Sequence, residues 1–572
     1  MRAALFLRYK KLIEGFVDPE FGGLVSVEPP KEAAFGDFST NVAMILAGKL
    51  NRNSVELAEE ICAKLREDDR FERAEVKKPG FINWFVPKRV LIDCVPDILD
   101  ENYGKSDLGK GRSINVEYVS ANPTGPIHAG HVRGAVSGDV LARLLSFVGY
   151  KVTKEFYVND AGRQVEVLAK SLYHRYLELL GKAGDLPFPS DGYPGEYLIE
   201  TAKKVVEERG DKFVGCEESE RLDFFKKFAV ADMLEDIKKD LRALDVAHDV
   251  FSSEKALIEG GAVERAINLL KSKNLVYRGV LPRPKGSDSD EWEEREQLLF
   301  KSTAFGDDVD RPLQKSDGSW TYFASDIAYH ANKIDRGFDE MVDFWGADHG
   351  GYVKRMQAAT SALSDGKKKL DVKLVQLVRL LKNGKEAKMS KRAGTFVTAR
   401  DIIDEVGKDV IRFIMLTRRD DAPLDFDFEK VVDQSRENPV FYTQYAYARS
   451  CSVMKLFQRV FPNKSLPSAG DANLALLDDQ DLQLVKKMSD WPRQVIIAAQ
   501  KREPHRIAFF LCELAAVFHS FWNQGRENSL LRFIIPEDLD KTRARLIVLK
   551  AMQNVMKTAI DIIGVTPVEE LR

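Results

Sequence analysis

The sequence contains few cysteines and no long apolar run. Its five cysteines are widely separated and include no CxxC pair, which argues against both a disulfide framework and a zinc knuckle. No window approaches the roughly 18 uninterrupted apolar residues of a membrane span. The opening segment carries Arg8, Lys10 and Lys11 within its only apolar stretch, so it is a poor secretory signal. These absences predict a cytoplasmic protein without a membrane segment.

The composition also lacks a strong charge of one sign. A net charge of −3 excludes a polybasic nucleic-acid coat protein, and 44% hydrophobic with 31% charged residues excludes a disordered or fibrous chain. A length of 572 residues predicts three or four domains. Residues 439–572 carry 18 Lys and Arg against 14 Asp and Glu. This excess is a weak indication of an anionic partner, and a helical bundle with solvated basic faces explains it equally well.

Hydrophobic patterning divides the chain into three regions and predicts an α/β multidomain protein. Residues 1–105 form an α+β module with a helix over 54–65 and a strand over 80–86. Residues 106–438 alternate strands (114–120, 152–158, 341–345, 374–380) with helices (129–148, 323–333), interrupted by insertions over about 164–320 that become turn-rich at 282–290. Residues 439–572 form an all-helical bundle with amphipathic stretches at 440–460, 482–499, 504–522 and 541–563, the second broken or kinked at Pro492.

The most informative stretch runs from Glu117 to His131 and reads EYVSANPTGPIHAGH. Pro126 suits the first helical position, and His128 and His131 then share one face of the first turn. A helix N-terminus suits phosphate, and Gly130 leaves room for a ligand beside the backbone. Such an imidazole pair is able to stabilise phosphoryl oxygens in a transition state. An isolated HxGH is about as often a coincidence or a structural pair.

A second motif, KMSKRAGT, occupies residues 388–395. It follows an Asn-Gly turn and precedes a helix expected to be capped by Thr398 with Asp401. Three cations in five residues suit the departing pyrophosphate of a triphosphate, although an exposed basic loop usually means only a solvated face. The motif supplies two candidate catalytic residues, Lys388 and Lys391. It also supplies two candidate ATP-binding residues, Met389 and Ser390.

With these two motifs the chain resembles class I aminoacyl-tRNA synthetases, and among them the bacterial type of arginyl-tRNA synthetase. The resemblance extends along essentially the whole chain. It is carried further by FGDFSTN (35–41), GFIN (80–83), SANPTGP (120–126), FYVNDAGRQ (156–164), GDDVDR (306–311), DGSWTYFASDIAYH (317–330), WGADH (345–349) and IIGV (562–565). Many members of the family have a degenerate second motif, whereas the motif is intact here.

The resemblance implies a split Rossmann catalytic domain over residues 106–438, a tRNA-binding module over 1–105 and an anticodon-binding bundle over 439–572. It implies ATP-dependent attachment of L-arginine to tRNA(Arg) through an arginyl-adenylate. It further implies magnesium with ATP, no zinc or other resident metal, and a monomer. Activation of arginine is expected to need bound tRNA.

The residues also support arginine as the substrate. Tyr322 and Asp326 lie at i and i+4 of an expected helix and so share a face, although a core tyrosine and a surface aspartate are the alternatives. A carboxylate binds a planar guanidinium through two parallel hydrogen bonds, which an ammonium group cannot imitate. Glu117 offers a second acidic partner at the end of the first strand. The candidate arginine-binding residues are Glu117, Ser120, Asn122, His131, Tyr322 and Asp326, and the resemblance assigns arginine contacts to Asn122, Tyr322 and Asp326.

Two further groups are candidates for nucleotide and RNA binding. Gly346, Asp348 and His349 follow a strand at the edge where such sheets bind nucleotides, and Asp348 suits the ribose hydroxyls unless it only caps the next helix. With Gly130, Met389 and Ser390 they form the predicted ATP site. Three tyrosines and an arginine early in the bundle are of the kinds that bind unpaired anticodon bases: Tyr442, Tyr445, Tyr447 and Arg449. An aromatic stripe of this kind is as often part of the core.

Three other functions remain open from the sequence. A glutamyl- or glutaminyl-tRNA synthetase would need a cation where Asp326 stands. A nucleotidylyltransferase also uses HxGH but has little need of the helical C-terminal region. A non-catalytic RNA-binding paralogue is expected to lose His128, His131 or Lys391, and all three are present.

Overall fold

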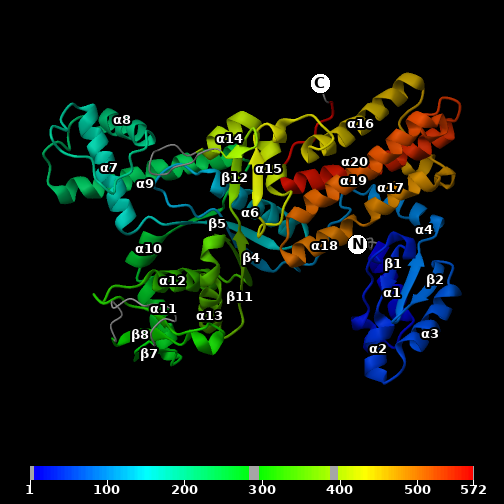
Figure 1. Ribbon diagram of the computed structural model, residues 1–572, viewed down its shortest axis with the longest axis horizontal. Helices are drawn as coiled ribbons and strands as arrows, with labels where there is room; N and C mark the ends of the chain where they lie inside the picture. The colour runs from blue at the N-terminus through cyan, green and yellow to red at the C-terminus, as the bar shows by residue number, and fades with distance from the viewer. Residues whose placement is uncertain (1–4, 282–294, 387–396, 571–572) are drawn as a thin grey trace. The chain divides into compact units, whose positions relative to one another are not determined.

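The computed structural model describes residues 5–281, 295–386 and 397–570 (Figure 1). Its internal contacts define two compact units. One unit consists of residues 107–433, and the other joins residues 1–106 to residues 434–572. The turn-rich stretch predicted at 282–290 lies outside the described residues. No helix within the described ranges has both the length and the apolar character needed to cross a membrane.

The unit of residues 107–433 is built on a five-stranded parallel sheet. Its order, β11-β10-β4-β5-β6, places the first strand in the middle with later strands added on each side. This is the order of a doubly wound nucleotide-binding fold and confirms the predicted α/β class. The strands are β4 (Ser113–Glu117), β5 (Lys151–Val158), β6 (Val250–Ser253), β10 (Glu340–Gly346) and β11 (Lys369–Val375).

Helices cover both faces of this sheet. On one face Tyr118, which follows β4, packs against α6 (Ala129–Phe147). Successive strand residues point to opposite faces, and Glu117 accordingly contacts Lys333 of α12 (Tyr322–Asp335) on the other side. Alongside α12 lies α13 (Val353–Ser364), and both bury apolar side chains against β10 and β11. The predicted helices at 129–148 and 323–333 are therefore confirmed.

The segment between β5 and β10 contains two insertions rather than one. A helical part has its own core, formed by α7 (Arg163–Leu179), α8 (Tyr197–Arg209) and α9 (Glu218–Ala243) (Figure 1). The chain then returns to the central sheet as β6. A second part follows, with α10 (Glu254–Glu259), α11 (Ala262–Ser272) and an antiparallel sheet of β7 (Val276–Gly279), β8 (Gln297–Phe300) and β9 (Arg311–Pro312).

The single strand predicted at 374–380 is wrong. Residues up to Val375 belong to β11, and Val378 starts β12 (Val378–Lys382) in a separate sheet. The chain leaves the central sheet at Gln376, whose N–H donates to the carbonyl of Asp420 at 2.8 Å. The small sheet also contains β13 (Lys385–Glu386) and β14 (Leu424–Asp427), and two helices lie between them in sequence, α14 (Ala399–Val406) and α15 (Lys408–Met415).

In the other unit, residues 1–106 form the predicted α+β module. An antiparallel sheet of order β1-β3-β2 packs an aromatic cluster that includes Tyr9, Phe71 and Trp84. The helix and strand expected at 54–65 and 80–86 are present. The elements are α1 (Leu5–Gly15), β1 (Phe38–Thr40), α2 (Val42–Leu50), α3 (Ser54–Arg66), β2 (Glu72–Lys77), β3 (Phe81–Phe85), α4 (Lys88–Ile92) and α5 (Val95–Ile98).

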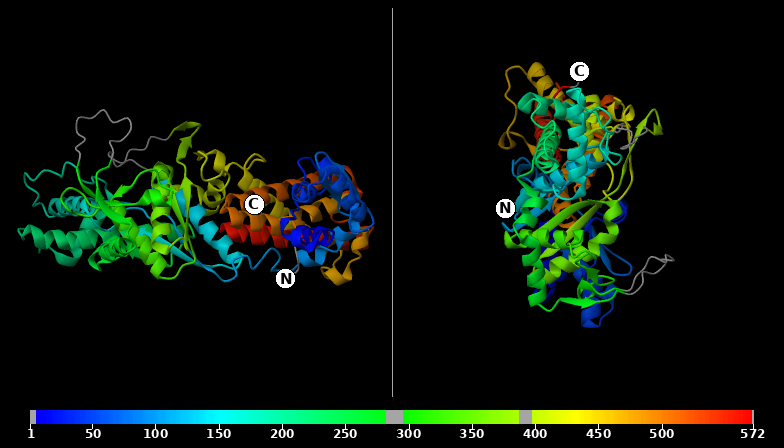
Figure 2. Two further views of the ribbon diagram at one scale, coloured as in Figure 1. Left: turned by 90° about the horizontal axis from the view of Figure 1, so that it is seen from below. Right: turned by 90° about the vertical axis from the view of Figure 1, so that its left-hand side faces the viewer.

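Residues from 434 onward form the predicted helical bundle, in which α19 and α20 pack along each other (Figures 1 and 2). The stretch predicted at 482–499 is divided at Asp490, and Pro492 stands at the start of the second helix, where a missing N–H costs nothing. The helices are α16 (Pro439–Val460), α17 (Asp479–Ser489), α18 (Trp491–Lys501), α19 (His505–Glu527) and α20 (Leu539–Ile563).

Candidate active site

Most of the predicted site residues that the structure describes follow strands at the carboxyl edge of the parallel sheet. Strands are added to one side of β4 by β5 and β6 and then to its other side by β10 and β11, so the order of addition reverses between the neighbours β4 and β10. The crevice at this point is where such sheets bind ligands. The chain leaving β4 carries the first motif into α6, and the chain leaving β10 carries Gly346, Asp348 and His349. Residues far apart in the sequence are thus brought to one crevice.

The two histidines of the first motif cap α6. His128 is the N-cap, with its Nδ1 accepting from the N–H of Gly130 at 3.1 Å. His131 reaches back, and its Nδ1 accepts from the N–H of His128 at 3.3 Å. The rings lie 4.0 Å apart between centroids, and a Cβ at position 130 would lie 2.9 Å from the His128 ring. Pro126 precedes the helix, so its predicted place at the first helical position is wrong.

The residues that follow the second motif form backbone hydrogen bonds with residues of the first motif. The N–H of Ala399 donates to the carbonyl of Ile127 at 2.8 Å, and His128 forms a β-bridge with Thr398. The predicted cap of α14 by Thr398 and Asp401 is confirmed. The motif residues Lys388, Met389, Ser390 and Lys391 lie outside the described residues.

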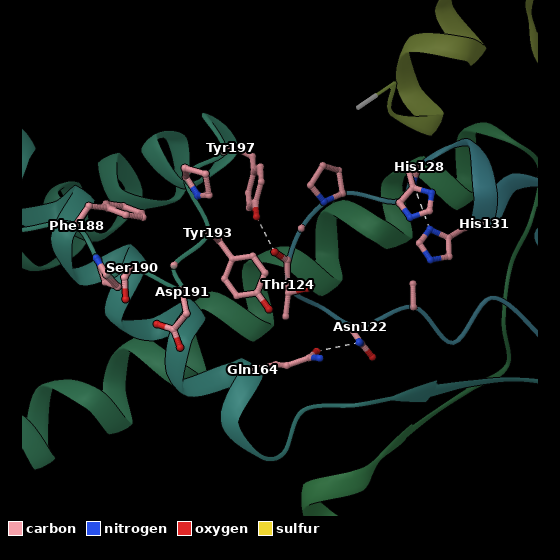
Figure 3. Close-up of a pocket in the computed structure, with 17 residues that line it drawn as sticks. Asn122, Thr124, His128, His131, Gln164, Phe188, Ser190, Asp191, Tyr193 and Tyr197 are labelled. Carbon is pink, nitrogen blue, oxygen red and sulfur yellow. Dashed lines mark hydrogen bonds between the residues drawn. The ribbon is translucent and has the colours of Figure 1, made fainter. Parts of the chain in front are cut away.

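A cavity of about 660 Å³ opens beside the histidines (Figure 3). Asn122 lines it and donates to Oε1 of Gln164 at 2.9 Å. Its far wall comes from residues 188–197 of the helical insertion, where the hydroxyl of Tyr197 donates to the carbonyl of Thr124 at 2.7 Å. The insertion therefore forms part of the site and supports the loop that precedes α6.

Asp326 lies half-buried on α12, which excludes the alternative of a surface charge. Its Oδ2 accepts from the hydroxyl of Tyr352 at 2.5 Å. Burial raises the pKa of this carboxyl, and the Tyr352 hydrogen bond acts in the opposite direction. Tyr322 begins the same helix with 72% of its surface exposed, so it is not a core aromatic. The two residues share a helix as predicted.

Glu117 is buried and already has a cation. Nζ of Lys333, which has no exposed surface, lies 2.6 Å from Oε2 of Glu117 and 2.9 Å from Oδ1 of Asp343. Asp343 also lies 3.0 Å from Nε2 of His330. Ser120 donates to Oε1 of Glu117 at 2.9 Å. Glu117 and Ser120 thus belong to a network beneath the crevice whose charges are compensated within the protein.

Glu254 is an acidic residue near Asp326 that the sequence pattern did not indicate. It is 6% exposed at the start of α10, directly after β6. Burial, followed by the negative charges of Asp326 and Asp160, raises its pKa to about 7. Across the described ranges no lysine or arginine forms an ion pair with Glu254 or Asp326. The only available signal was its place after a short strand, which the pattern had assigned to an insertion.

The segment after β10 is open to solvent. The Asp348 side chain is 82% exposed, and its Oδ2 lies 3.5 Å from Nε2 of His349. Oδ1 of Asp348 folds back over Gly346, where a Cβ would lie only 2.4 Å away. An exposed carboxylate at this edge of the sheet is accessible to the hydroxyls of a nucleotide ribose.

Three family models match consecutive parts of the chain. The model "tRNA synthetases class I (R), catalytic domain" matches residues 94–443, more than half of the chain. This makes the protein a class I aminoacyl-tRNA synthetase by family. "Arginyl tRNA synthetase N terminal domain" matches residues 10–86, and "DALR anticodon binding domain" matches residues 443–571. The chain belongs to the arginyl-tRNA synthetase family.

Individual relatives agree with this membership. Arginine–tRNA ligase of Ruegeria pomeroyi is 53% identical over 551 residues, covering 96% of this chain and 94% of the relative. The enzyme of Nitrobacter winogradskyi is 51% identical over 563 residues, with the same coverage. A structure of a putative arginyl-tRNA synthetase from Campylobacter jejuni has a TM-score of 0.71 at 31% identity, covering 84% of this chain and 98% of the other. Arginyl-tRNA synthetase of Thermus thermophilus has the same fold (TM-score 0.74, 20% identity, coverage 99% and 100%).

Proposed function

We propose that the chain is an arginine–tRNA ligase, which forms L-arginyl-tRNA(Arg), AMP and diphosphate from L-arginine, tRNA(Arg) and ATP. The observation that carries the choice of amino acid is a pair of acidic side chains, the buried Glu254 and the half-buried Asp326, neither of which has a lysine or arginine partner in the described structure. A cationic, planar guanidinium is the group that such a pair binds best. Family membership supports the same substrate.

The reaction has two steps. The arginine carboxylate attacks the α-phosphorus of ATP, the bond to the bridging oxygen breaks, and diphosphate leaves with its Mg²⁺. The terminal hydroxyl of the tRNA then attacks the arginyl carbonyl and releases AMP. His128 and His131, at the N-terminus of α6, stabilise charge on the phosphoryl oxygens, as do Lys388 and Lys391.

The ATP site combines both edges of the crevice. We assign the ribose to Asp348 and His349 beyond Gly346, and the phosphates to the backbone at Gly130. Met389 and Ser390 of the second motif complete this set by family resemblance. Arginine then lies against Asn122, Tyr322, Asp326 and Glu254, with Ser120 and Glu117 beneath them.

The rival functions fit this site less well. A glutamyl- or glutaminyl-tRNA synthetase has an acidic or neutral side chain to bind, and the carboxyls of Asp326 and Glu254 would repel or fail to recognise it. A nucleotidylyltransferase leaves the matched N-terminal and anticodon-binding domains without a role.

We assign anticodon contacts to a cavity of about 330 Å³ in the bundle, lined among others by Tyr442, Tyr445, Arg449 and His519. The guanidinium of Arg449 stacks over the rings of Tyr445 at 3.9 Å and Trp522 at 4.8 Å between Cζ and centroid. Aromatic rings beside a fixed cation suit unpaired bases. We leave Tyr447 out of this assignment, because the residue is 7% exposed and takes the alternative place in the core.

Arg449→Met is expected to raise the KM for tRNA(Arg) roughly tenfold. Base stacking, together with the contact of a base with a cation such as the Arg449 guanidinium, contributes about 1–3 kcal/mol of binding free energy per base. The KM for arginine should change less than twofold. Steady-state charging measures both values. Arg459→Met, in the last turn of the same helix and exposed, is the matched control and should leave both unchanged. An equal tRNA KM in the two variants would remove the cavity from the RNA-binding surface.

The N-terminal module, residues 1–105, is proposed to bind another part of the tRNA. Its sheet carries a cavity of about 610 Å³ whose lining includes the partly exposed rings of Phe35 and Phe81. Lys31, Lys77 and Lys78 belong to the same lining. Exposed aromatics interleaved with lysines suit a single unstacked nucleotide. We further propose a cytoplasmic monomer, which sedimentation of the full chain tests.

ATP–pyrophosphate exchange with each of the twenty amino acids tests the proposed function. Of the twenty amino acids, only arginine is expected to support exchange. Exchange with arginine is expected only after tRNA(Arg) is added. The hydrogen bonds that join the start of α14 to the start of α6 offer a physical route for this dependence. Because the start of α14 follows the second motif, a displacement of that motif would also move the first motif at the start of α6. Exchange with glutamate or glutamine would overturn the arginine assignment, whereas brisk arginine exchange without RNA would overturn only the tRNA requirement.

A further inference from the structure

Asp326 is held by a residue outside the predicted set. Tyr352 ends η4 (Ala347–Tyr352), the turn that follows β10, and donates its hydroxyl to Oδ2 of Asp326 at 2.5 Å. Burial, followed by the charge of Asp326, raises the pKa of Tyr352, so its hydroxyl stays protonated at physiological pH and is available as a donor. The hydrogen bond that holds Asp326 therefore comes from a residue that no motif indicated.

The ring of Tyr352 is fixed on three sides. It makes an edge contact with Phe323 at 6.1 Å and a tilted contact with Trp345 at 5.9 Å between centroids. The guanidinium of Arg355 lies over it, 4.7 Å from the centroid. A cation above a phenol ring withdraws electron density and strengthens the hydroxyl as a donor. The position of the hydroxyl is thus set by packing within the protein.

The GDDVDR segment contributes a second cation. Arg311 is locked by Asp307 through two hydrogen bonds, from Nε at 2.7 Å and from Nη2 at 2.8 Å. Its charge and that of Arg355 both act on the Tyr352 hydroxyl. This segment belongs to the second insertion, which thereby contributes to the electrostatic environment of Tyr352.

We propose that Tyr352 is a positioning residue for amino-acid recognition, which holds the Asp326 carboxylate in the orientation that accepts the guanidinium. Each carboxylate oxygen accepts two hydrogen bonds, so Tyr352 on Oδ2 still leaves both oxygens able to form a bidentate pair with arginine. The inference rests on the proposed function, because it assumes that Asp326 binds arginine. It adds a residue whose side chain need not touch the substrate.

Tyr352→Phe keeps the ring contacts and removes only the hydroxyl. The KM for arginine in tRNA charging is expected to rise roughly 10- to 100-fold, the range for a hydrogen bond to a charged group. The KM for ATP should change less than twofold. Tyr277→Phe is the matched control, because its hydroxyl also donates to a carboxylate, Oδ2 of Asp310 at 2.8 Å, outside the pocket. That variant should leave the arginine KM unchanged.

The pH profile separates positioning from a general loss of structure. Without the Tyr352 donor the pKa of Asp326 rises further, so arginine affinity is lost at a higher pH on acidification than in the parent. The groups that act on Asp326 or titrate beside it are Tyr352, His349, His330, Asp343, Glu254 and Tyr157. A purely structural defect would weaken ATP binding as well, and it would not shift the pH at which arginine affinity is lost.

A double variant shows whether the effect passes through Asp326. If it does, Tyr352→Phe combined with Asp326→Asn binds arginine no more weakly than Asp326→Asn alone. Additive losses would overturn the inference, as would an arginine KM within twofold of the parent in Tyr352→Phe while Asp326→Asn is impaired. An unimpaired Asp326→Asn would overturn both the inference and the proposed arginine pocket.

Discussion

Replacing His131 with alanine is expected to slow arginyl-adenylate formation by about 10²-fold, measured as single-turnover release of diphosphate with tRNA present. Removing one donor from a site that stabilises transition-state charge costs about 10²–10³ in rate. Lys391→Ala should have an effect of the same order, because it removes a charge directed at the departing diphosphate. The KM for arginine should change far less than the rate.

His131 also caps a helix, so alanine alone does not separate catalysis from folding. Its Nδ1 accepts the N–H of His128, and loss of such a cap costs about 1 kcal/mol of stability. His131→Asn offers an amide oxygen near the same place and keeps that bond. It is expected to unfold at the parent's denaturant midpoint and still be about 10²-fold slow. Parent-like adenylation by the asparagine variant would reduce the role of His131 to capping.

Features set by neighbouring residues could be predicted from the sequence. The HAGH pair at the start of α6 and the cap of α14 depend only on residues within one turn, and both are present. The break at Pro492 follows from its missing N–H in the same way. Only the place of Pro126 was wrong, because it suits a first turn but lies ahead of α6, whose first N–H groups the histidines satisfy.

Features set by the order of the strands could not be predicted. Glu254 comes within electrostatic reach of Asp326 because β6 pairs with β5 at the edge of the sheet. A four-residue strand in a helical region carries too little pattern to be identified. The pairing of Lys333 with Glu117 and Asp343 likewise depends on α12 crossing both β4 and β10. Family resemblance supplied Asp326, but neither resemblance nor spacing indicated that Tyr352 fixes it.

Asp326→Asn is expected to raise the KM for arginine roughly 100-fold or more while the KM for ATP stays within about twofold. The amide keeps the shape of the carboxylate and loses a charged hydrogen bond of about 1.5–3 kcal/mol, and a guanidinium left partly unpaired in a closed pocket adds to the loss. Asp335→Asn, exposed at the end of the same helix, is the control and should behave as the parent. Equal arginine KM values in the two variants would remove Asp326 from the pocket.

The pH dependence of arginine affinity provides an independent test of the acidic pair. In the free protein the pKa of Glu254 is about 7, raised by burial and then by the charges of Asp326 and Asp160. A bound guanidinium favours the ionised carboxylate, so binding releases a proton, and affinity should rise between about pH 6 and 8 and level off above. In Asp326→Asn one of those charges is gone and the pKa of Glu254 falls, so the midpoint should move to lower pH even though binding is weaker throughout. A midpoint that does not move would show that the two carboxyls do not share one guanidinium.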